Sequence, residues 1–503
     1  MSSIRVRIPP SPTGLLHIGT VRTALYNYLF AKHNKGVMVF RIEDTDKERG
    51  TKEFEDDIIN GLTKLGIAGD EGIHIHPNSR NSPKSPNSRK YYGPYRQSER
   101  TEIYKKYLQE LLAGDHAYYC FCSKERLDKM REEQAAKKLP PRYDGCCAGL
   151  DPKESAKRVA QGEKAVIRLR VPRDKDVRWR DLVRGEVAIQ SGELDDFVIA
   201  RAIHDPLYNF TVVVDDHTME ITHVIRGEDH ISNTPKQMLI FQAFGWKLPE
   251  FAHLPLILNE DRSKLSKRKN KVSVDDYLKE GYLPEALLNF LALIGWNPGD
   301  TKQEIFSMEE LIEKFTLEHV HKGGAVFDLK KLDWINGEYI KKAIKDDVDT
   351  FYARISDRVQ GYDAALVKKI LRDPDFEGRF KKLSEVPAEL APIFAPLPDY
   401  PLNLLANEKF KITPDILKTT LTAAKKKAES LEWKKGDSAK AKAISDAMIS
   451  LVAELGLKNG QVLWPIRAAL SGAEKSPNFA TLAVYLGKEE TLKRLDVALN
   501  KLK

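Results

Sequence analysis

The stretch that decides the fold reads Pro10-Ser11-Pro12-Thr13-Gly14-Leu15-Leu16-His17-Ile18-Gly19-Thr20. Before it, Ile4, Val6 and Ile8 alternate with arginines, which is the period-two pattern of a β-strand. After it, apolar residues recur at helical spacing through residues 21–29. The prolines and Gly14 break the chain between these two segments. The sequence therefore predicts a loop in which a parallel strand leads into a helix.

The end of this loop predicts an entrance for a nucleotide. His17 and Gly19 lie where the helix begins, and the free N–H groups of a helix N-terminus carry partial positive charge that suits a phosphate. His17 can add a hydrogen bond there. Gly19 has no Cβ and allows a flat ring to approach the backbone.

A second predicted strand, residues 37–42, ends in the carboxylates of Glu43, Asp44 and Asp46. In an open parallel sheet, ligands bind at the carboxyl ends of the strands. The acidic cluster could therefore pair with an ammonium group of a ligand. A solvated turn or a helix cap is the alternative interpretation of the same residues.

Length and composition exclude several classes of protein. A chain of 503 residues should contain about two to four domains, and its 42% apolar and 31% charged residues are ordinary for a soluble protein. It contains neither an apolar run long enough to cross a membrane nor an apolar secretory segment. Four cysteines do not make a disulfide framework in so long a chain. We therefore expect a cytoplasmic protein without a membrane partner.

The positive charge is concentrated near the C-terminus. Residues 401–503 carry 18 Lys and Arg against 11 Asp and Glu, so most of the net charge of +8 lies there. This pattern indicates a polyanionic partner. A solvated, lysine-rich helical surface explains the charge equally well.

All four cysteines fall within one short segment as Cys120, Cys122, Cys146 and Cys147. Thiolates are preferred ligands of Zn²⁺, and two close pairs can form a tetrahedral site. Adjacent cysteines, however, rarely reach one ion together. Four reduced thiols without a metal are the alternative.

Strands and helices alternate again in the middle of the chain. A strand is predicted from residue 166, a buried strand over residues 211–216, and another over 221–225 that leads to Arg226. A helix near residues 235–244 and a strand at 254–258 follow. We interpret these as the second half of a doubly wound α/β core, with a mixed α/β insert between the halves.

A lysine-dense loop, residues 261–269, follows the last of these strands. Such a loop can close over a polyphosphate, and its ammonium groups would stabilise the negative charge that develops when pyrophosphate leaves. On its own, a basic loop is usually solvated.

The remainder is predicted to be helical, with helices near residues 284–293, 308–315, 330–340 and 414–454. Residues 461–467 are predicted to turn into a last helix, with Pro465 in its first turn. Residues 77–90 are polar and rich in Ser, Asn and Pro, which predicts a surface loop.

Several short motifs follow one another along the chain. They read Pro10-Ser11-Pro12-Thr13-Gly14, His17-Ile18-Gly19-Thr20, Arg41-Ile42-Glu43-Asp44-Thr45-Asp46, Gly93-Pro94-Tyr95-Arg96-Gln97-Ser98-Glu99-Arg100, Lys264-Leu265-Ser266-Lys267-Arg268, Gly323-Gly324-Ala325-Val326-Phe327-Asp328 and Trp464-Pro465-Ile466-Arg467-Ala468-Ala469-Leu470-Ser471-Gly472. In this order, the chain resembles the bacterial glutamyl-tRNA synthetases over essentially its whole length. Residues 17–20 match the HIGH motif of that family with threonine in the fourth place, and residues 264–268 match its KMSKS motif.

The resemblance implies an α/β fold with a Rossmann-type class I synthetase core and an all-helical anticodon-binding domain. Its expected domains are the first half of the catalytic core (1–110), an acceptor-end insert with a candidate zinc site (111–200), the second half of the core (201–272), a stem-contact region (273–335) and the helical anticodon-binding domain (336–503).

The resemblance also implies a two-step, ATP-dependent reaction. Glutamate attacks the α-phosphorus of ATP and releases pyrophosphate, and the glutamyl group then passes to the terminal adenosine of tRNA. Expected cofactors are ATP and Mg²⁺, with Zn²⁺ as an addition. Expected partners are L-glutamate and tRNA-Glu, with tRNA-Gln as a further candidate, and we expect a monomer.

Functional residues are carried over where the motifs match. The expected catalytic residues are His17, Lys264 and Lys267. The expected ATP-binding residues are Thr13, His17, Gly19, Thr20, Lys264, Ser266, Lys267 and Arg268. The expected glutamate-binding residues are Arg7, Ser11, Glu43, Tyr208 and Arg226.

Three departures from the family pattern bear on these expectations. Pro9 stands where alanine is usual and removes a backbone donor beside the pocket. The loop at residues 77–90 is longer than usual. In relatives that bind zinc, the ligands resemble Cys120, Cys122, Cys147 and a histidine two residues later, where this chain has Gly149. The fourth ligand would then be Cys146 or Asp151.

The resemblance further matches Arg379 to an arginine that reads the third anticodon base and favours discrimination against tRNA-Gln. A plain surface arginine is the alternative. Rival interpretations of the whole chain are a glutaminyl-tRNA synthetase, a truncated glutamyl-queuosine enzyme, a nucleotidyltransferase acting on a small molecule, and a non-catalytic RNA-binding protein. The basic, helical residues 330–503 argue against the first three, and intact motifs at His17 and Lys267 argue against the last.

Overall fold

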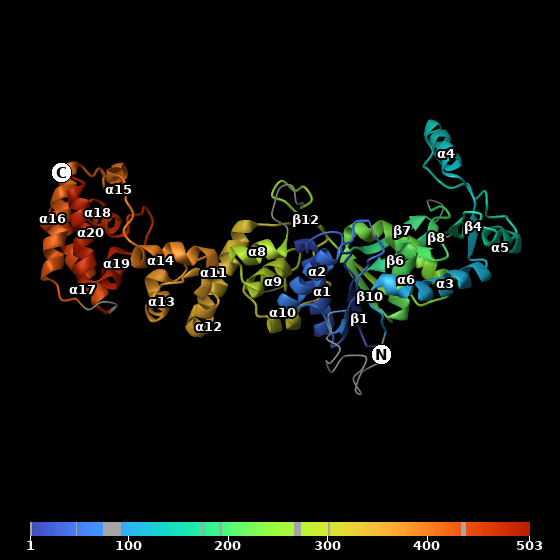
Figure 1. The fold of residues 1–503 in the computed structure, drawn as a ribbon, viewed down its shortest axis with the longest axis horizontal. Helices are drawn as coiled ribbons and strands as arrows, with labels where there is room; N and C mark the ends of the chain where they lie inside the picture. Colours follow the sequence, from blue (N-terminus) through green and yellow to red (C-terminus); the bar gives the residue numbers. More distant parts are fainter. Residues whose placement is uncertain are drawn as a thin grey trace. The chain divides into compact units, whose positions relative to one another are not determined.

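The computed structural model describes residues 3–46, 48–73, 92–173, 176–190, 194–265, 273–299, 302–433 and 439–502. The chain divides into two compact units. The first comprises Met1–Leu278 and Pro284–Leu329, and the second comprises Lys279–Leu283 and Lys330–Lys503. In the described residues, strands occur only in the first unit (Figure 1).

The first unit opens with the predicted strand, loop and helix. β1 (Arg5–Ile8) leads through the loop to α1 (Ile18–His33), and β2 (Val37–Phe40) returns parallel to β1, with Arg5 opposite Val37. β3 (Glu71–Gly72) extends this parallel sheet after α2 (Lys52–Lys64). All of β1 is buried, including its two arginines, so the alternating pattern does not mark a solvated face.

A second sheet of the first unit has the strand order β10-β11-β6-β7. β10 (His223–Gly227) pairs in parallel with β11 (Glu250–Leu254), and α7 (Thr234–Ala243) connects them. β6 (Asp176–Asp181) and β7 (Gly185–Gln190) form a hairpin that joins β11 through Phe251 and Asp181. The hairpin therefore extends the sheet of β10 and β11, although it lies within the expected insert.

Residues 211–216 form a helix, so the prediction of a strand there is wrong. They belong to α6 (Tyr208–Thr218), whose residues from Phe210 to Asp216 are all buried. A helix that is covered on every side has no polar stripe, and a short apolar run cannot then distinguish a helix from a buried strand.

The middle of the first unit is mixed α/β, as predicted. α3 (Thr101–Ala113) precedes an antiparallel sheet of β4 (Ala117–Cys120), β5 (Val166–Leu169), β8 (Val198–Ala202) and β9 (Asp205–Pro206). The helices α4 (Lys124–Ala136) and α5 (Pro152–Ala160) lie between β4 and β5 in the chain. The first unit ends with β12 (Ile257–Leu258), α9 (Pro284–Leu293), α10 (Met308–Lys314) and β13 (Ala325–Val326), with α8 (Val274–Glu280) at the junction.

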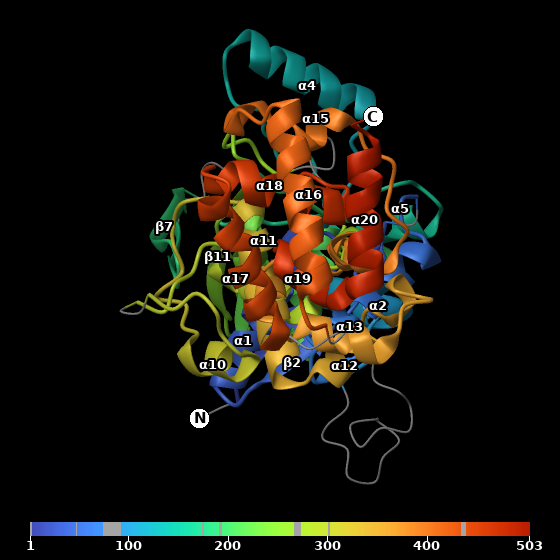
Figure 2. The same cartoon turned by 90° about the vertical axis from the view of Figure 1, so that its left-hand side faces the viewer.

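The second unit is helical throughout its described residues. Its helices are α11 (Leu329–Asp346), α12 (Val348–Ala353), α13 (Ala364–Leu371), α14 (Val386–Phe394), α15 (Leu402–Leu405), α16 (Pro414–Ser430), α17 (Ala439–Glu454), α18 (Asn459–Ser471), α19 (Phe479–Leu486) and α20 (Lys488–Asn500). Figure 2 shows α16, α18 and α20 side by side, and their apolar faces form one core. No described helix of either unit is long and apolar enough to cross a membrane.

Pro465 lies in the middle of α18, so the prediction that it belongs to the first turn of a helix is wrong. Proline has no N–H to donate to the carbonyl four residues earlier, which belongs to Gln461. The hydroxyl of Thr420, on neighbouring α16, donates to that carbonyl at 3.5 Å. Tertiary packing thus compensates for a residue that usually ends helices.

Candidate active site

A cavity of about 390 Å³ opens at the carboxyl ends of β1 and β10 in the first unit. It brings together most of the predicted substrate residues. These are Arg7, Ser11, His17, Gly19, Thr20, Glu43, Tyr208, Arg226 and Lys264. Thr13 is exposed and does not line the cavity, and Ser266, Lys267 and Arg268 lie outside the described residues.

His17 is the N-cap of α1. Its Nδ1 accepts a hydrogen bond from the backbone N–H of Gly19 at 2.9 Å, which leaves the ring proton on Nε2. A Cβ on residue 19 would lie 3.2 Å from the same Nδ1, so glycine makes room for the histidine ring. Gly19 therefore fixes the position of the His17 ring through its N–H group and leaves room for it by having no side chain.

Lys264 follows the short strand β12 and is exposed at the rim of the cavity. Its ammonium group lies 3.4 Å from the carboxylate of Asp229. An exposed ion pair of this length is weak, so a phosphate can compete for the lysine.

Ion pairs connect Arg7 and Glu43 to four other buried charged groups, none of which lines the cavity. Asp216 accepts from Nε of Arg7 at 3.3 Å and pairs with Arg41 at 2.6 Å. Arg41 also pairs with Glu43 at 3.1 Å. Behind them, Asp215 pairs with Arg100 at 2.7 Å. Arg7 and Glu43 are thus held by a continuous network of opposite charges.

Sequence reasoning assigned no role to Arg41, Arg100, Asp215 or Asp216. Two of these residues lie in the quoted motifs, and the other two end a run of valines. For Arg41, Asp215 and Asp216, a charge beside an apolar run was the available signal, because a charge is almost never fully buried without a partner. The polar neighbours of Arg100 gave no such signal.

Glu43 has an unusual affinity for protons. Its side chain is 4% exposed, and burial raises its pKa to about 7, although the nearby Arg41 guanidinium acts in the opposite direction. A buried carboxylate at the wall of a cavity is suited to an ammonium group of a ligand.

Arg226 is held in a different way, by neutral groups. Its Nη1 donates to Gln237 Oε1 and its Nη2 to Thr234 Oγ1, each at 2.8 Å. Its Nε donates to His253 Nε2 at 3.1 Å. Among the described residues, no carboxylate lies within ion-pair distance of this guanidinium. Burial, the largest cause, lowers its pKa to about 10.

Tyr208 begins α6 and lines the same cavity. Its hydroxyl lies 3.1 Å from Nδ1 of His230. Burial and then the charge of Arg226 lower the pKa of His230 to about 4, so this histidine is neutral near pH 7. The cavity therefore combines two buried guanidinium groups, a buried carboxyl group and neutral donors, which suits a zwitterion that carries an additional carboxylate.

The sequence matches two family models that together span almost the whole chain. Residues 3–334 match "tRNA synthetases class I (E and Q), catalytic domain", and residues 332–499 match "Anticodon binding domain". The chain belongs to the class I tRNA synthetases for glutamate and glutamine. It is therefore an aminoacyl-tRNA synthetase, a ligase, with the predicted α/β catalytic core and helical anticodon domain.

Several relatives that match over nearly their whole length are glutamate–tRNA ligases. The synthetase is 42% identical to the glutamate–tRNA ligase of Carboxydothermus hydrogenoformans, over 98% of this chain and 99% of the relative. It is 42% identical to that of Clostridium botulinum, over 100% and 99%. A glutamate–tRNA ligase structure from Elizabethkingia meningosepticum, in complex with its amino acid, matches all of both chains with a TM-score of 0.83 and 34% identity.

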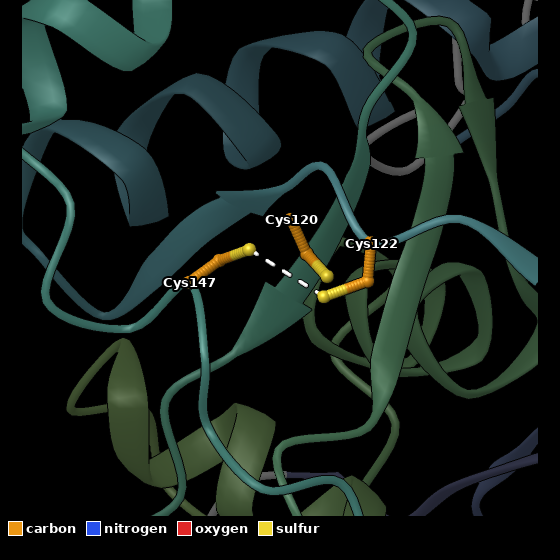
Figure 3. A group of neighbouring side chains, drawn as sticks. All are labelled: Cys120, Cys122 and Cys147. Carbon is orange, nitrogen blue, oxygen red and sulfur yellow. Dashed lines mark hydrogen bonds between the residues drawn. The ribbon is translucent and has the colours of Figure 1, made fainter. Parts of the chain in front are cut away.

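The synthetase also contains a compact group of three thiols. The ligand atoms of Cys120, Cys122 and Cys147 lie within 4.8 Å of one another, and Figure 3 shows their sulfur atoms turned toward a common point. The hydroxyl of Tyr143 lies 3.3 Å from the sulfur of Cys120 and 3.5 Å from that of Cys122.

Neither predicted fourth ligand belongs to this group. Asp151 caps α5, where its carboxylate accepts from the N–H of Glu154 at 2.8 Å. Cys146 is exposed, since adjacent side chains in a tight turn diverge. The oxygen of Tyr143, which sequence reasoning missed, lies beside two of the three sulfur atoms and accepts from the backbone N–H of Cys147 at 3.0 Å.

Arg379 lies in the second unit, shortly after the turn Pro374–Phe376. Its Nε is 2.7 Å from Oε2 of Glu389, and the side chain is partly buried. It is therefore not an isolated surface arginine, although its role in anticodon reading remains a prediction.

Proposed function

We propose that this synthetase is a glutamate–tRNA ligase. It activates L-glutamate with ATP to give glutamyl-adenylate and pyrophosphate, and then transfers glutamate to the 3′-terminal adenosine of tRNA-Glu. The names of the full-length relatives support this assignment. The observation that carries it is Arg226, a buried guanidinium with neutral protein partners that lines one cavity with Glu43.

Glutamate fits this cavity by charge. Arg226 and Arg7 would bind its carboxylates, because a guanidinium can donate two parallel hydrogen bonds to a carboxylate. Glu43 would pair with the α-ammonium group, while Ser11 and Tyr208 would supply hydroxyl hydrogen bonds. Glutamine has only one carboxylate and could therefore pair with only one of the two arginines.

ATP would lie along the N-terminus of α1, where His17, Gly19 and Thr20 line the cavity. The Nε2 proton of His17 and the ammonium group of Lys264 would stabilise charge on the phosphates. Lys267, Ser266 and Arg268 are also expected to bind the phosphates of ATP, and this expectation rests on the sequence motif alone. The assignment of Thr13 to ATP binding likewise rests on the sequence alone. Mg²⁺, when bound, neutralises phosphate charge, and it is held largely by the phosphates themselves.

The thiol group fits a structural zinc ion. Three sulfur atoms and the oxygen of Tyr143 provide four donors, which is the number that Zn²⁺ takes in closed sites. Zinc there would connect β4 to the turn before α5. Metal analysis of purified protein should find about one zinc per chain, and Cys122→Ser should reduce it.

The second unit would bind the anticodon end of tRNA. Its helices carry most of the net positive charge, which suits a polyanion. Arg379 is our candidate reader of the third anticodon base, and a base would have to replace Glu389 as its partner. A monomeric state and a cytoplasmic location remain predictions from the sequence.

The decisive experiment measures charging of purified tRNA-Glu and tRNA-Gln with labelled glutamate and, separately, with labelled glutamine. Charging of tRNA-Glu with glutamate alone supports the proposal and the role of Arg379. Charging of both tRNAs with glutamate supports the ligase but overturns discrimination by Arg379. Charging with glutamine, or no charging beside active controls, overturns the proposal.

A further inference from the structure

The orientation of Arg226 depends on a residue outside the cavity. Nδ1 of His253 donates to Oδ2 of Asp181 at 2.5 Å, and Nε2 of His253 accepts from Nε of Arg226 at 3.1 Å. All three side chains are buried. Asp181 ends β6, His253 lies on β11 and Arg226 lies on β10, so the chain of hydrogen bonds crosses the sheet from strand to strand.

The two hydrogen bonds of His253 depend on each other. A neutral imidazole carries one proton, so one nitrogen donates and the other accepts. Asp181 is an ionised acceptor, and its pKa is lowered by the hydrogen bond from His253 in spite of burial. It therefore holds the proton on Nδ1 and leaves Nε2 free to accept from Arg226. Thr234 Oγ1, 3.0 Å from Nε2, can donate its hydroxyl proton there as well.

We propose that Asp181 and His253 are positioning residues that orient the Arg226 guanidinium for a carboxylate of glutamate. This inference rests on the proposed function, because it assumes that Arg226 binds glutamate. The residues do not touch the substrate. They act by fixing the direction of Nε, and with it the plane in which the two terminal nitrogens of Arg226 lie.

Asp181 also has a structural task that must be separated from this one. Its other oxygen, Oδ1, accepts from the backbone N–H groups of Val183, Arg184 and His253. An Asn side chain can keep these three hydrogen bonds through its amide oxygen. Its amide nitrogen then faces Nδ1, which forces the histidine proton onto Nε2. Two donors, Nε2–H and the Nε–H of Arg226, would then face each other.

Asp181→Asn is therefore the informative variant. In tRNA-Glu charging assays, we expect the KM for glutamate to rise about 10- to 100-fold, because a hydrogen bond to a charged group is replaced by a buried donor pair. The KM for ATP should change less than about twofold, since the change is confined to the partners of Arg226. The matched control is Asp196→Asn. Asp196 is a buried carboxylate that accepts from Tyr118 and the N–H of Val171, away from Arg226.

A double-mutant cycle tests the route through His253. His253→Gln can present an amide oxygen to Arg226 without needing Asp181 to hold a proton. In this background, Asp181→Asn should leave the KM for glutamate unchanged, within about twofold. An equal rise in both backgrounds would overturn the proposal. If Asp181→Asn fails to fold, His253→Phe against His253→Gln makes the same test, because only glutamine retains the acceptor.

Arg226→Lys separates failure of this inference from failure of the proposed function. If this variant keeps the KM of the parent enzyme for glutamate, Arg226 does not bind glutamate and the proposed role fails. If Arg226→Lys raises that KM but Asp181→Asn does not, only the positioning role is overturned.

Discussion

Arg7 and Arg226 line the same cavity, are both nearly fully buried, and are stabilised in opposite ways. Arg7, 2% exposed, lies against Asp216 in a network of buried opposite charges. Arg226, 5% exposed, has neutral partners in Gln237, Thr234 and His253. A buried charge is costly unless an opposite charge compensates it. The fold compensates Arg7 itself and provides no carboxylate for Arg226, which is why we propose that a carboxylate of glutamate binds to Arg226.

The largest effect should come from removing the arginine with neutral partners. We expect Arg226→Ala to lower kcat/KM for glutamate by about 10²- to 10³-fold, as removing one partner of a buried charged contact commonly does. Its thermal midpoint should fall less than that of Arg7→Ala, because buried acceptors lose a donor but no protein carboxylate loses its partner. Arg7→Ala should lower both quantities, since Asp216 loses a cation. Arg201→Ala, which removes an exposed arginine paired with Asp205, is the control. Equal destabilisation by Arg226→Ala and Arg7→Ala would break the comparison.

The next effect concerns the charged network itself. Asp215→Asn should destabilise the region around α6 by about 3 kcal/mol, because it leaves Arg100 without its buried counter-charge. Native-state hydrogen exchange of peptides from α6 measures this locally. The control Asp205→Asn removes an exposed carboxylate and should cost at most about 1 kcal/mol. Similar exchange in both variants would show that the network adds no stability.

A carboxylate introduced beside Arg226 tests directly whether the neutral partners of this arginine matter for glutamate binding. Gln237→Glu places a carboxylate beside Nη1 of Arg226, where it imitates the situation of Arg7. The KM for glutamate should rise about 10- to 50-fold, because protein and substrate then compete for one cation. Gln242→Glu adds the same charge to an exposed position of α7 and should have little effect. A lower KM for glutamate in Gln237→Glu would contradict the idea of an arginine reserved for the ligand.

The smallest effect is a pH dependence at Glu43. Its pKa, raised to about 7 by burial, implies that the carboxylate needed for the ammonium group is lost as the pH falls below that value. The KM for glutamate should therefore rise by about tenfold per pH unit below 7, while the KM for ATP stays flat. Glu43→Gln should raise the KM for glutamate at every pH and remove this slope. A slope that persists in Glu43→Gln would assign it to another group.

The spacing of apolar residues was sufficient to predict the strands and helices in which that spacing is regular. β1, the loop and α1 follow from the alternation before Pro10 and the helical spacing after His17. The strand predicted at residues 211–216 was wrong because a fully buried helix has no polar side. His253 and Asp181 could not be found, since neither lies in a motif and their role depends on strands that pair across the sheet.

The residues of the candidate site likewise fall into those that the sequence predicted and those that it did not. Residues contributed by quoted motifs, such as His17 and Glu43, were placed beside the cavity in advance, because a motif fixes both the residue and its loop. Tyr143, the neighbour of the three thiols, was missed because it belongs to no known spacing of metal ligands. It is recognised only by the distance of its hydroxyl to two sulfur atoms.

The pairing of β6 with β11 has a consequence for modular exchange between synthetases. The β6–β7 hairpin cannot be transplanted or deleted together with the neighbouring α/β segment, because it forms one side of the sheet that carries Arg226. Its removal would expose the edge of β11 and invite pairing with another chain. A graft that keeps residues 176–190 leaves this edge covered, whereas deletion of these residues should promote aggregation. The segment that can be exchanged between synthetases is therefore shorter than the insert expected from the sequence, residues 111–200.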